Sequence, residues 1–129
     1  MILLDTHVLV WSQLRGSKLS RAAASSIRRA RASDGLAISA ITLVELAGLI
    51  RRGRVALHGS FETTIQELIA KVTIKPITLD IAVLTAHFPP DFPSDPMDRI
   101  IAATARAENL PLVTADERIL SCPLLKTIW

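Results

Sequence analysis

Residues 1–5, Met1-Ile-Leu-Leu-Asp5, place an acid directly after a short apolar run, and Leu112-Val-Thr-Ala-Asp116 repeats the arrangement near the other end of the chain. Each apolar run predicts a short strand buried on both faces, as in a parallel sheet. Both carboxylates would then stand at the carboxyl ends of strands. In open α/β sheets, that edge is where ligands bind.

The rest of the chain alternates between strand-like and helix-like segments. Strands are expected at residues 2–5, 36–39, 72–77, 112–114 and 125–128. Helices are expected at residues 6–14, 20–32, 42–52, 61–71, 79–88 and 97–108, with a helical turn at 117–121. Gly16-Ser17 predicts a break between the first two helices. This order predicts a single α/β domain over residues 1–129, with a central parallel sheet and helices on both faces.

The helix expected at 61–71 is amphipathic. Its apolar residues predict an inner face formed by Phe61, Ile65, Leu68 and Ile69.

The composition and the first residues indicate in which cellular compartment the protein is expected. Half of the 129 residues are hydrophobic, but no apolar run approaches the ~20 residues that a membrane-spanning helix needs. Met1 leads directly into a strand, without the basic segment that begins a signal peptide. Cys122 is the only cysteine, which excludes an internal disulfide and a cysteine-based metal site. A cytoplasmic protein without membrane contact is therefore expected.

Three further acids fall near predicted helix starts, and each has a structural explanation. Thr42 and Glu45 match a capping box, in which the glutamate binds the backbone N–H of the cap residue. Asp95 before Pro96 is typical of a helix start, and Asp98 then occupies a second capping position in the first turn. Structural and functional roles do not exclude one another here, since a helix start can hold an acid over a sheet edge.

The acids at the two strand ends are not equivalent. Asp116 precedes a helical turn and can serve as its N-cap. Thr6 can cap the helix after the first strand, which would leave Asp5 without a capping role. An acid after a fully apolar strand is costly to desolvate without a partner, so Asp5 carries the stronger indication of function.

Several carboxylates at one sheet edge stay ionised only if cations offset their repulsion. Oxygen ligands without a His or Cys cluster favour hard ions such as Mg²⁺ or Mn²⁺. Such an ion lowers the pKa of a bound water and neutralises phosphoryl oxygens. The pattern therefore predicts metal-dependent hydrolysis of a phosphodiester.

Arginines gather on two predicted helices, within a chain of net charge +3 and pI about 9.6. They can contact the backbone of a polyanion, although a solvated helix face and cations favoured at helix carboxyl ends explain them equally. The candidates for RNA binding are Arg28, Arg29, Arg31, Arg51, Arg52 and Arg54. With no tyrosine and 4% aromatic residues, an aromatic platform for base stacking is not expected.

Four motifs, in this order, resemble those of the PIN-domain ribonucleases, and within them the VapC-type toxins of toxin–antitoxin pairs. They are Leu3-Leu-Asp-Thr-His-Val-Leu-Val-Trp11, Ser39-Ala-Ile-Thr-Leu-Val-Glu-Leu46, Asp95-Pro-Met-Asp-Arg-Ile-Ile-Ala-Ala-Thr-Ala105 and Leu112-Val-Thr-Ala-Asp116. The resemblance implies a three-layer α/β/α domain around a parallel sheet. It also implies a metal-dependent endoribonuclease, the toxin of a type II module.

The resemblance also implies roles for individual residues. The metal-binding and catalytic acids map onto Asp5, Glu45, Asp98 and Asp116. Asp95 resembles an extra acid of one subgroup. Thr114 matches a hydroxyl that supports the acid two residues later, and Thr6 is expected to support Asp5 in the same way. His7 belongs to the subgroup motif, and its structural alternative is a histidine at a helix start near the acids.

Partners also follow from the resemblance. They are an RNA substrate, a small VapB-like antitoxin, a second copy of the chain in a homodimer, and a toxin–antitoxin hetero-oligomer. The antitoxin is expected to pack into an apolar groove and to place a basic residue in the acidic site. The groove candidates, which have an equal interpretation as core, are Trp11, Leu46, Leu49 and Ile50.

Two other classes stay open at the level of sequence. A phosphatase resembling the haloacid dehalogenase group would use Asp5 as a covalent nucleophile, but it needs a second acid at position 7, which is His7. A receiver-like signalling module, or another non-catalytic metal-binding domain, would fit the clustered acids and Lys75-Pro76. The receiver needs an acid after a central strand, whereas the second strand ends in Ser39.

Overall fold

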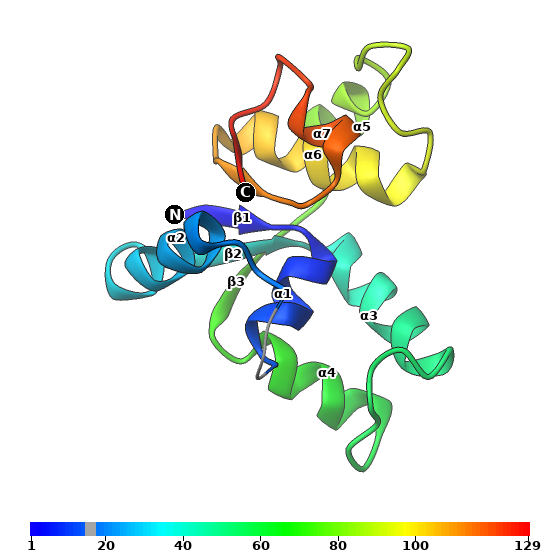
Figure 1. Cartoon of the computed structure of the whole chain (residues 1–129). Helices are drawn as coiled ribbons and strands as arrows, with labels where there is room; N and C mark the ends of the chain where they lie inside the picture. Colours follow the sequence, from blue (N-terminus) through cyan, green and yellow to red (C-terminus); the bar gives the residue numbers. More distant parts are fainter. Residues whose placement is uncertain (15–17) are drawn as a thin grey trace.

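The computed structural model describes residues 1–14 and 18–129 and has a five-stranded sheet at its centre (Figure 1). The strands are β1 (Ile2–Leu4), β2 (Leu36–Ser39), β3 (Val72–Lys75), β4 (Leu112–Val113) and β5 (Thr127–Ile128). They lie in the order β3-β2-β1-β4-β5, and every pairing is parallel. The predicted parallel sheet is confirmed, while the predicted break at Gly16-Ser17 lies outside the described residues.

Helices cover both faces of this sheet. They are α1 (Thr6–Ser12), α2 (Arg21–Ala32), α3 (Ile41–Arg51), α4 (Phe61–Ile69), α5 (Leu79–Leu84), α6 (Pro96–Glu108) and α7 (Glu117–Leu120). In Figure 1, α5, α6 and α7 lie above the strands, and α1, α3 and α4 lie below them. The three-layer α/β/α architecture is therefore confirmed. Among the described residues, no helix is long and apolar enough to cross a bilayer.

Alternation along each short strand divides the core between the two faces. In β1, Ile2 and Leu4 pack with residues of α1 and α2, whereas Leu3 packs on the opposite side with residues of α6. β2 and β4 follow the same rule, because side chains of successive strand residues point to opposite faces. The small residues of α6 at this contact are fully or almost fully buried and are Ala102 and Ala105. They bring α6 close to the sheet.

The strand order places a reversal next to β1. The chain passes from β1 to β2 and β3 on one side, then crosses to β4 and β5 on the other. The backbone N–H of Asp5 bonds to the Val113 carbonyl at 3.0 Å, which ties the ends of β1 and β4 together. In open α/β sheets, ligands bind in the crevice outside such a reversal.

The structure shortens the helix predicted at 79–88, which ends at Leu84, and the strand predicted at 125–128, which begins at Thr127. It also corrects two other details. Phe61 does not face inward: it is 43% exposed, whereas Ile65, Leu68 and Ile69 pack against the core. β3 ends at Lys75 rather than at residue 77, since Pro76 has no N–H to donate to a neighbouring strand.

Candidate functional site

A pocket of about 450 Å³ opens at the carboxyl edge of the sheet, and all five predicted acids line it. They come from four separate places in the chain: the end of β1, the second turn of α3, the start of α6 and the residues after β4. The complete lining is Asp5, His7, Val8, Trp11, Glu45, Asp95, Asp98, Ala115 and Asp116.

Asp5 is held by two hydrogen bonds, one to each carboxylate oxygen. Its Oδ1 accepts from the backbone N–H of Thr6 at 2.8 Å, and its Oδ2 accepts from the Thr114 hydroxyl at 2.8 Å. Asp5 is thus the N-cap of α1, and the prediction that Thr6 caps this helix is wrong. The bond to Thr114 joins residues at the ends of β1 and β4, so it fixes the Asp5 carboxylate at the crevice.

Thr6 uses its hydroxyl for a different acid. The buried Thr6 Oγ1 donates to Glu45 Oε1 at 2.7 Å and lies 3.0 Å from the hydroxyl of Thr42. The predicted capping box of Thr42 and Glu45 is therefore wrong. The N-cap of α3 is Ala40, without a side-chain hydrogen bond, and Glu45 turns toward α1 instead.

The start of α6 carries two acids with unequal surroundings. Asp95 is the N-cap, as predicted, and accepts from the backbone N–H of Met97 at 2.9 Å, with Pro96 following it. Asp98 lies in the first turn and is half-buried. Across residues 1–14 and 18–129, no hydrogen bond to its carboxylate is found, so the predicted second capping role of Asp98 does not occur.

Asp116 caps α7, as the structural interpretation predicted. Its Oδ1 accepts from the backbone N–H of Arg118 at 2.9 Å and of Ile119 at 3.4 Å. The Thr114 hydroxyl accepts from the Asp116 backbone N–H at 3.2 Å, while its own proton goes to Asp5. Thr114 therefore orients the Asp5 carboxylate and touches only the backbone of Asp116.

Burial and crowding shift the proton affinity of three of these acids. Burial raises the pKa of Asp5, against the opposing hydrogen bonds from Thr114 and Thr6. Burial likewise raises the pKa of Glu45, opposed by the Thr6 hydroxyl and reinforced by the charge of Asp5. Burial, followed by repulsion from the other four acids, raises the pKa of Asp98 to about 7. The pocket thus favours a cation or a proton.

The donor atoms fit a hard divalent cation, but the side chains do not yet converge on one point. In the described parts of the chain, no three His, Cys, Asp or Glu side chains form a ready-made metal site. Asp5, Glu45 and Asp116 are held by hydrogen bonds to their neighbours, whereas Asp98 is not. The oxygens of these carboxylates are the ligands that Mg²⁺ and Mn²⁺ prefer.

None of the six predicted RNA-binding arginines lines this pocket within the described chain. All six are exposed. Arg28, Arg29 and Arg31 lie toward the carboxyl end of α2, which leads directly into the start of β2 and so lies at the opposite edge of the sheet. Arg51 is the last residue of α3, and Arg52 and Arg54 follow it.

The apolar part of the pocket wall was not predicted. It comprises Val8, Trp11 and Ala115, and Trp11 had been a candidate for the partner groove instead. Its signal in the sequence is the spacing of four residues from His7, which places both on one face of α1. The other groove candidates, Leu46, Leu49 and Ile50, are buried at 0%, 8% and 6% exposure and belong to the core.

Comparison with known proteins gives a consistent family. The family model described as the PIN domain matches residues 2–122. Ribonuclease VapC22 of Mycobacterium tuberculosis (strain ATCC 25618 / H37Rv) is 38% identical over 130 residues, which cover 99% of this chain and 98% of that protein.

Solved structures share the fold at lower sequence identity. The crystal structure of VapBC2 from Rickettsia felis, bound to a DNA fragment from its promoter, matches with a TM-score of 0.75 and 19% identity, over 98% of this chain and 97% of that one. Mycobacterium tuberculosis VapC20, described as a toxin that cleaves the sarcin-ricin loop, matches with a TM-score of 0.66 and 16% identity, over 98% and 99%.

The raised pKa of Asp98 predicts how pH changes the stability of the metal-free protein. The folded state keeps a proton on Asp98 up to a pH of about 7, while the unfolded chain releases it near the ordinary value of 3.8. Between these values the folded state binds more protons, so its stability falls as pH rises. Asp98→Asn should therefore lose less melting temperature than the wild type between about pH 5 and pH 8, measured in EDTA.

The exposed acid Asp91 supplies the matched control. Asp91→Asn removes the same charge outside the pocket and should keep the wild-type pH dependence. If the melting temperature of Asp98→Asn depends on pH as that of the wild type does, then Asp98 does not have the raised pKa that this prediction assumes.

Proposed function

Since the chain belongs to the PIN-domain family, as a VapC-type ribonuclease toxin of a type II toxin–antitoxin system, we propose that the five acids of the pocket carry out the cleavage of RNA. Nucleases of this family are metal-dependent hydrolases. The proposal rests on one observation: Asp5, Glu45, Asp95, Asp98 and Asp116 share a single pocket at the carboxyl edge of the sheet.

We assign the cation, Mg²⁺ or Mn²⁺, to Asp5 and Asp98, with Asp116 and Glu45 completing its surroundings. When bound, such an ion activates water and neutralises the charge on phosphoryl oxygens. Thr114 and the Thr6 N–H hold the two Asp5 oxygens in a fixed orientation. Asp95 adds negative charge at the rim and supports the helix that carries Asp98.

Glu45 is suited to orient the attacking water and to accept its proton. Its Oε1 is fixed by the Thr6 hydroxyl, and Oε2 has no protein partner among the described residues. Burial raises its pKa, which makes the ionised Glu45 a stronger base than an exposed carboxylate. The proton of the water would pass to Glu45, and the leaving oxygen of the RNA would take a proton from solvent.

The two alternative classes lose their support. The chain matches the PIN-domain model over residues 2–122, which argues against both a phosphatase of the haloacid dehalogenase type and a receiver-like module. Lys75, which suggested the receiver, pairs with Glu108 at 3.6 Å and does not line the acidic pocket in the described structure.

The arginines remain proposals for contacts with the RNA backbone. Arg51 and Arg52 lie at the end of α3, the helix that carries Glu45, so an RNA strand leaving the pocket along α3 would reach them. Arg28, Arg29 and Arg31 would contact only RNA that extends around to the opposite edge of the sheet.

Asp5→Asn tests the proposed site directly. It keeps the shape of the side chain and removes the charge that a cation needs. We expect Mn²⁺-dependent RNA cleavage to fall by more than ~100-fold, because even partners of metal ligands typically cost 10–100-fold. Circular dichroism would establish that the variant is folded, and Asp91→Asn would serve as the control. A folded Asp5→Asn variant that cuts RNA like the wild type would exclude Asp5 from the site.

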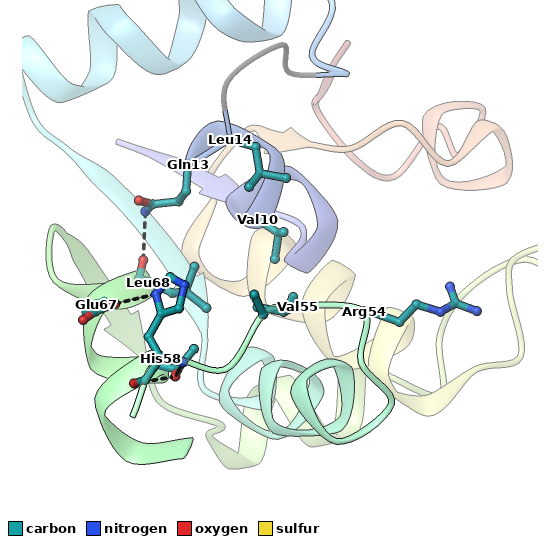
Figure 2. Close-up of a pocket in the computed structure, with 10 residues that line it drawn as sticks. Val10, Gln13, Leu14, Arg54, Val55, His58, Glu67 and Leu68 are labelled. Carbon is teal, nitrogen blue, oxygen red and sulfur yellow. Dashed lines mark hydrogen bonds and ion pairs between the residues drawn. The ribbon is translucent and has the colours of Figure 1, made fainter. Parts of the chain in front are cut away.

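A second pocket supports binding of an antitoxin. It has a volume of about 250 Å³ and lies between α1, α4 and the segment after α3 (Figure 2). Its apolar wall includes Val10, Leu14, Val55 and Leu68. Figure 2 shows Gln13 bonded to the Leu68 carbonyl, at 3.0 Å, and His58 paired with Glu67, at 3.4 Å. We propose that an amphipathic helix of a VapB-like antitoxin lays its apolar face here, and that a basic antitoxin residue reaches the acidic pocket.

Leu14→Asp tests this groove, since Leu14 is 57% exposed and can be changed without disturbing the core. We expect affinity for a VapB-like antitoxin to fall by ~10-fold or more, as for a central anchor of an interface. RNA cleavage by the free protein should stay unchanged. Leu124→Asp, at a position 47% exposed on the other side of the sheet, is the control. Equal affinity of both variants would place the antitoxin elsewhere.

Exposed apolar residues support a homodimer. Four large side chains within residues 74–83 are exposed, at 39%, 45%, 79% and 52%; they are Ile74, Ile77, Leu79 and Val83. An exposed apolar surface of this kind is typical of an interface. We propose that a second copy of the chain covers it.

Light scattering coupled to size exclusion should find a dimer for the wild type and a monomer for Val83→Asp, because a charge at this position would be buried in the interface. A Val83→Asp variant that stays dimeric would place the interface away from α5.

A further inference from the structure

The acidic pocket has an apolar side that hydrolysis of a phosphodiester does not explain. Carboxylates form one part of its lining, while Val8, Trp11 and Ala115 form another. A cation and a phosphate need only charged and polar neighbours. The apolar side therefore indicates that a further part of the substrate, flat or apolar, lies next to the phosphate.

Helix α1 contributes residues to two different pockets, and Trp11 belongs to the set that lines the acidic one. His7 and Trp11 are one helical turn apart and both line the acidic pocket, with ring centroids 6.0 Å apart and planes inclined at 48°. Val10 of α1 and Leu14, just after the end of this helix, line the groove of Figure 2 instead. Residues four apart on a helix share a face, so His7 and Trp11 form one surface beside the acidic pocket.

The position of Trp11 is not explained by the core. Among the described residues, Trp11 is in neither hydrophobic core cluster, although its neighbour Trp129 packs against one of them. Trp129 follows β5 and so lies at the same edge of the sheet, 5.9 Å from the Trp11 ring. Trp129 therefore contacts Trp11 in a tilted arrangement, and of these two rings only Trp11 lines the acidic pocket.

A cation lies over one face of the same ring. The Lys18 ammonium is 5.9 Å from the centroid of the Trp11 ring, and Lys18 is exposed. A flat apolar surface with an amine next to it, at the rim of a pocket of acids, matches one nucleotide of a single strand: a base, its phosphate and a neighbouring cation site. A volume of about 450 Å³ is ample for one nucleotide unit.

We propose that Trp11 is a substrate-binding residue, on which an unpaired base beside the scissile phosphate stacks, with His7 at the rim and Lys18 facing the backbone. This rests on the proposed function, since it assumes that RNA enters the acidic pocket. It makes the protein selective for unpaired RNA, because a base inside a duplex cannot reach the ring. The low aromatic content predicted no stacking platform, but a single ring at the site is sufficient for one base.

Fluorescence gives a test that does not depend on activity, because Trp11 and Trp129 are the only two tryptophans. In an Asp5→Asn/Trp129→Phe variant, Trp11 is the sole fluorophore and cleavage is blocked. With Mg²⁺ present, a single-stranded oligoribonucleotide should quench this fluorescence to saturation. The same backbone lacking its bases should bind with little quenching. Equal quenching by both, or none by either although the RNA binds, would overturn the proposal.

Kinetics give the second measurement. Removal of a stacking ring typically weakens binding of a base by ~5- to 150-fold. We expect Trp11→Ala to raise KM by that factor with a smaller change in kcat, while Trp11→Phe keeps most of the affinity. Phe61→Ala, which removes an exposed ring on α4, is the control and should match the wild type. If Trp11→Ala does not fold, the fluorescence measurement still decides.

The outcomes separate this inference from the proposed function. Absence of RNA cleavage by the wild type with either metal would contradict the proposed function, not the stacking alone. Cleavage with a wild-type KM in folded Trp11→Ala would contradict only the stacking. Quenching of Trp11 by an arginine-containing peptide but not by RNA would assign the ring to a basic residue of the antitoxin and overturn the proposal.

Discussion

Repulsion among five carboxylates in one pocket is the constraint around which the rest of the structure is arranged. Burial and mutual repulsion both favour protonation, as the pKa of about 7 for Asp98 shows. The fold offsets part of this cost with fixed donors: the Thr114 hydroxyl and the Thr6 N–H for Asp5, and helix-end N–H groups for Asp95 and Asp116. The negative charge that these donors do not offset attracts a divalent cation. Metal-dependent hydrolysis, the chemistry of this family, uses such a cation.

Helix α1 connects the two surfaces on which activity and control would depend. Its first residue holds Asp5 through its N–H and Glu45 through its hydroxyl. One of its faces lines the acidic pocket and the neighbouring face lines the apolar groove. An antitoxin helix in the groove would therefore contact the same short helix that lines the acidic pocket. In the proposed arrangement, this helix of seven residues would contact both the antitoxin and the RNA.

The sequence predicted helix starts correctly where the capping residue bonds only to its near neighbours in the chain. Ser20 caps α2 and Asp95-Pro96 begins α6 as expected, because a cap involves only the next few residues. The same local rule failed for Thr42 and Glu45, where the fully buried hydroxyl of Thr6, 36 and 39 residues earlier in the chain, bonds to both. Phe61 failed as an inward residue because α4 packs on the core through Ile65, Leu68 and Ile69, while Phe61, its first residue, stays 43% exposed.

The sequence by itself determined the alternation of strands and helices, the parallel sheet, and the presence of acids at strand and helix ends, because each of these follows from the polarity of neighbouring residues. Only the tertiary structure decided which side chains share a pocket. Asp5 accepts a hydrogen bond from Thr114, 109 residues away in the chain. Trp11, predicted to line the partner groove, lines the acidic pocket instead. The physical reason is that the strand order, with β4 beside β1, is set by packing across the whole sheet, and this order fixes every distance within the site.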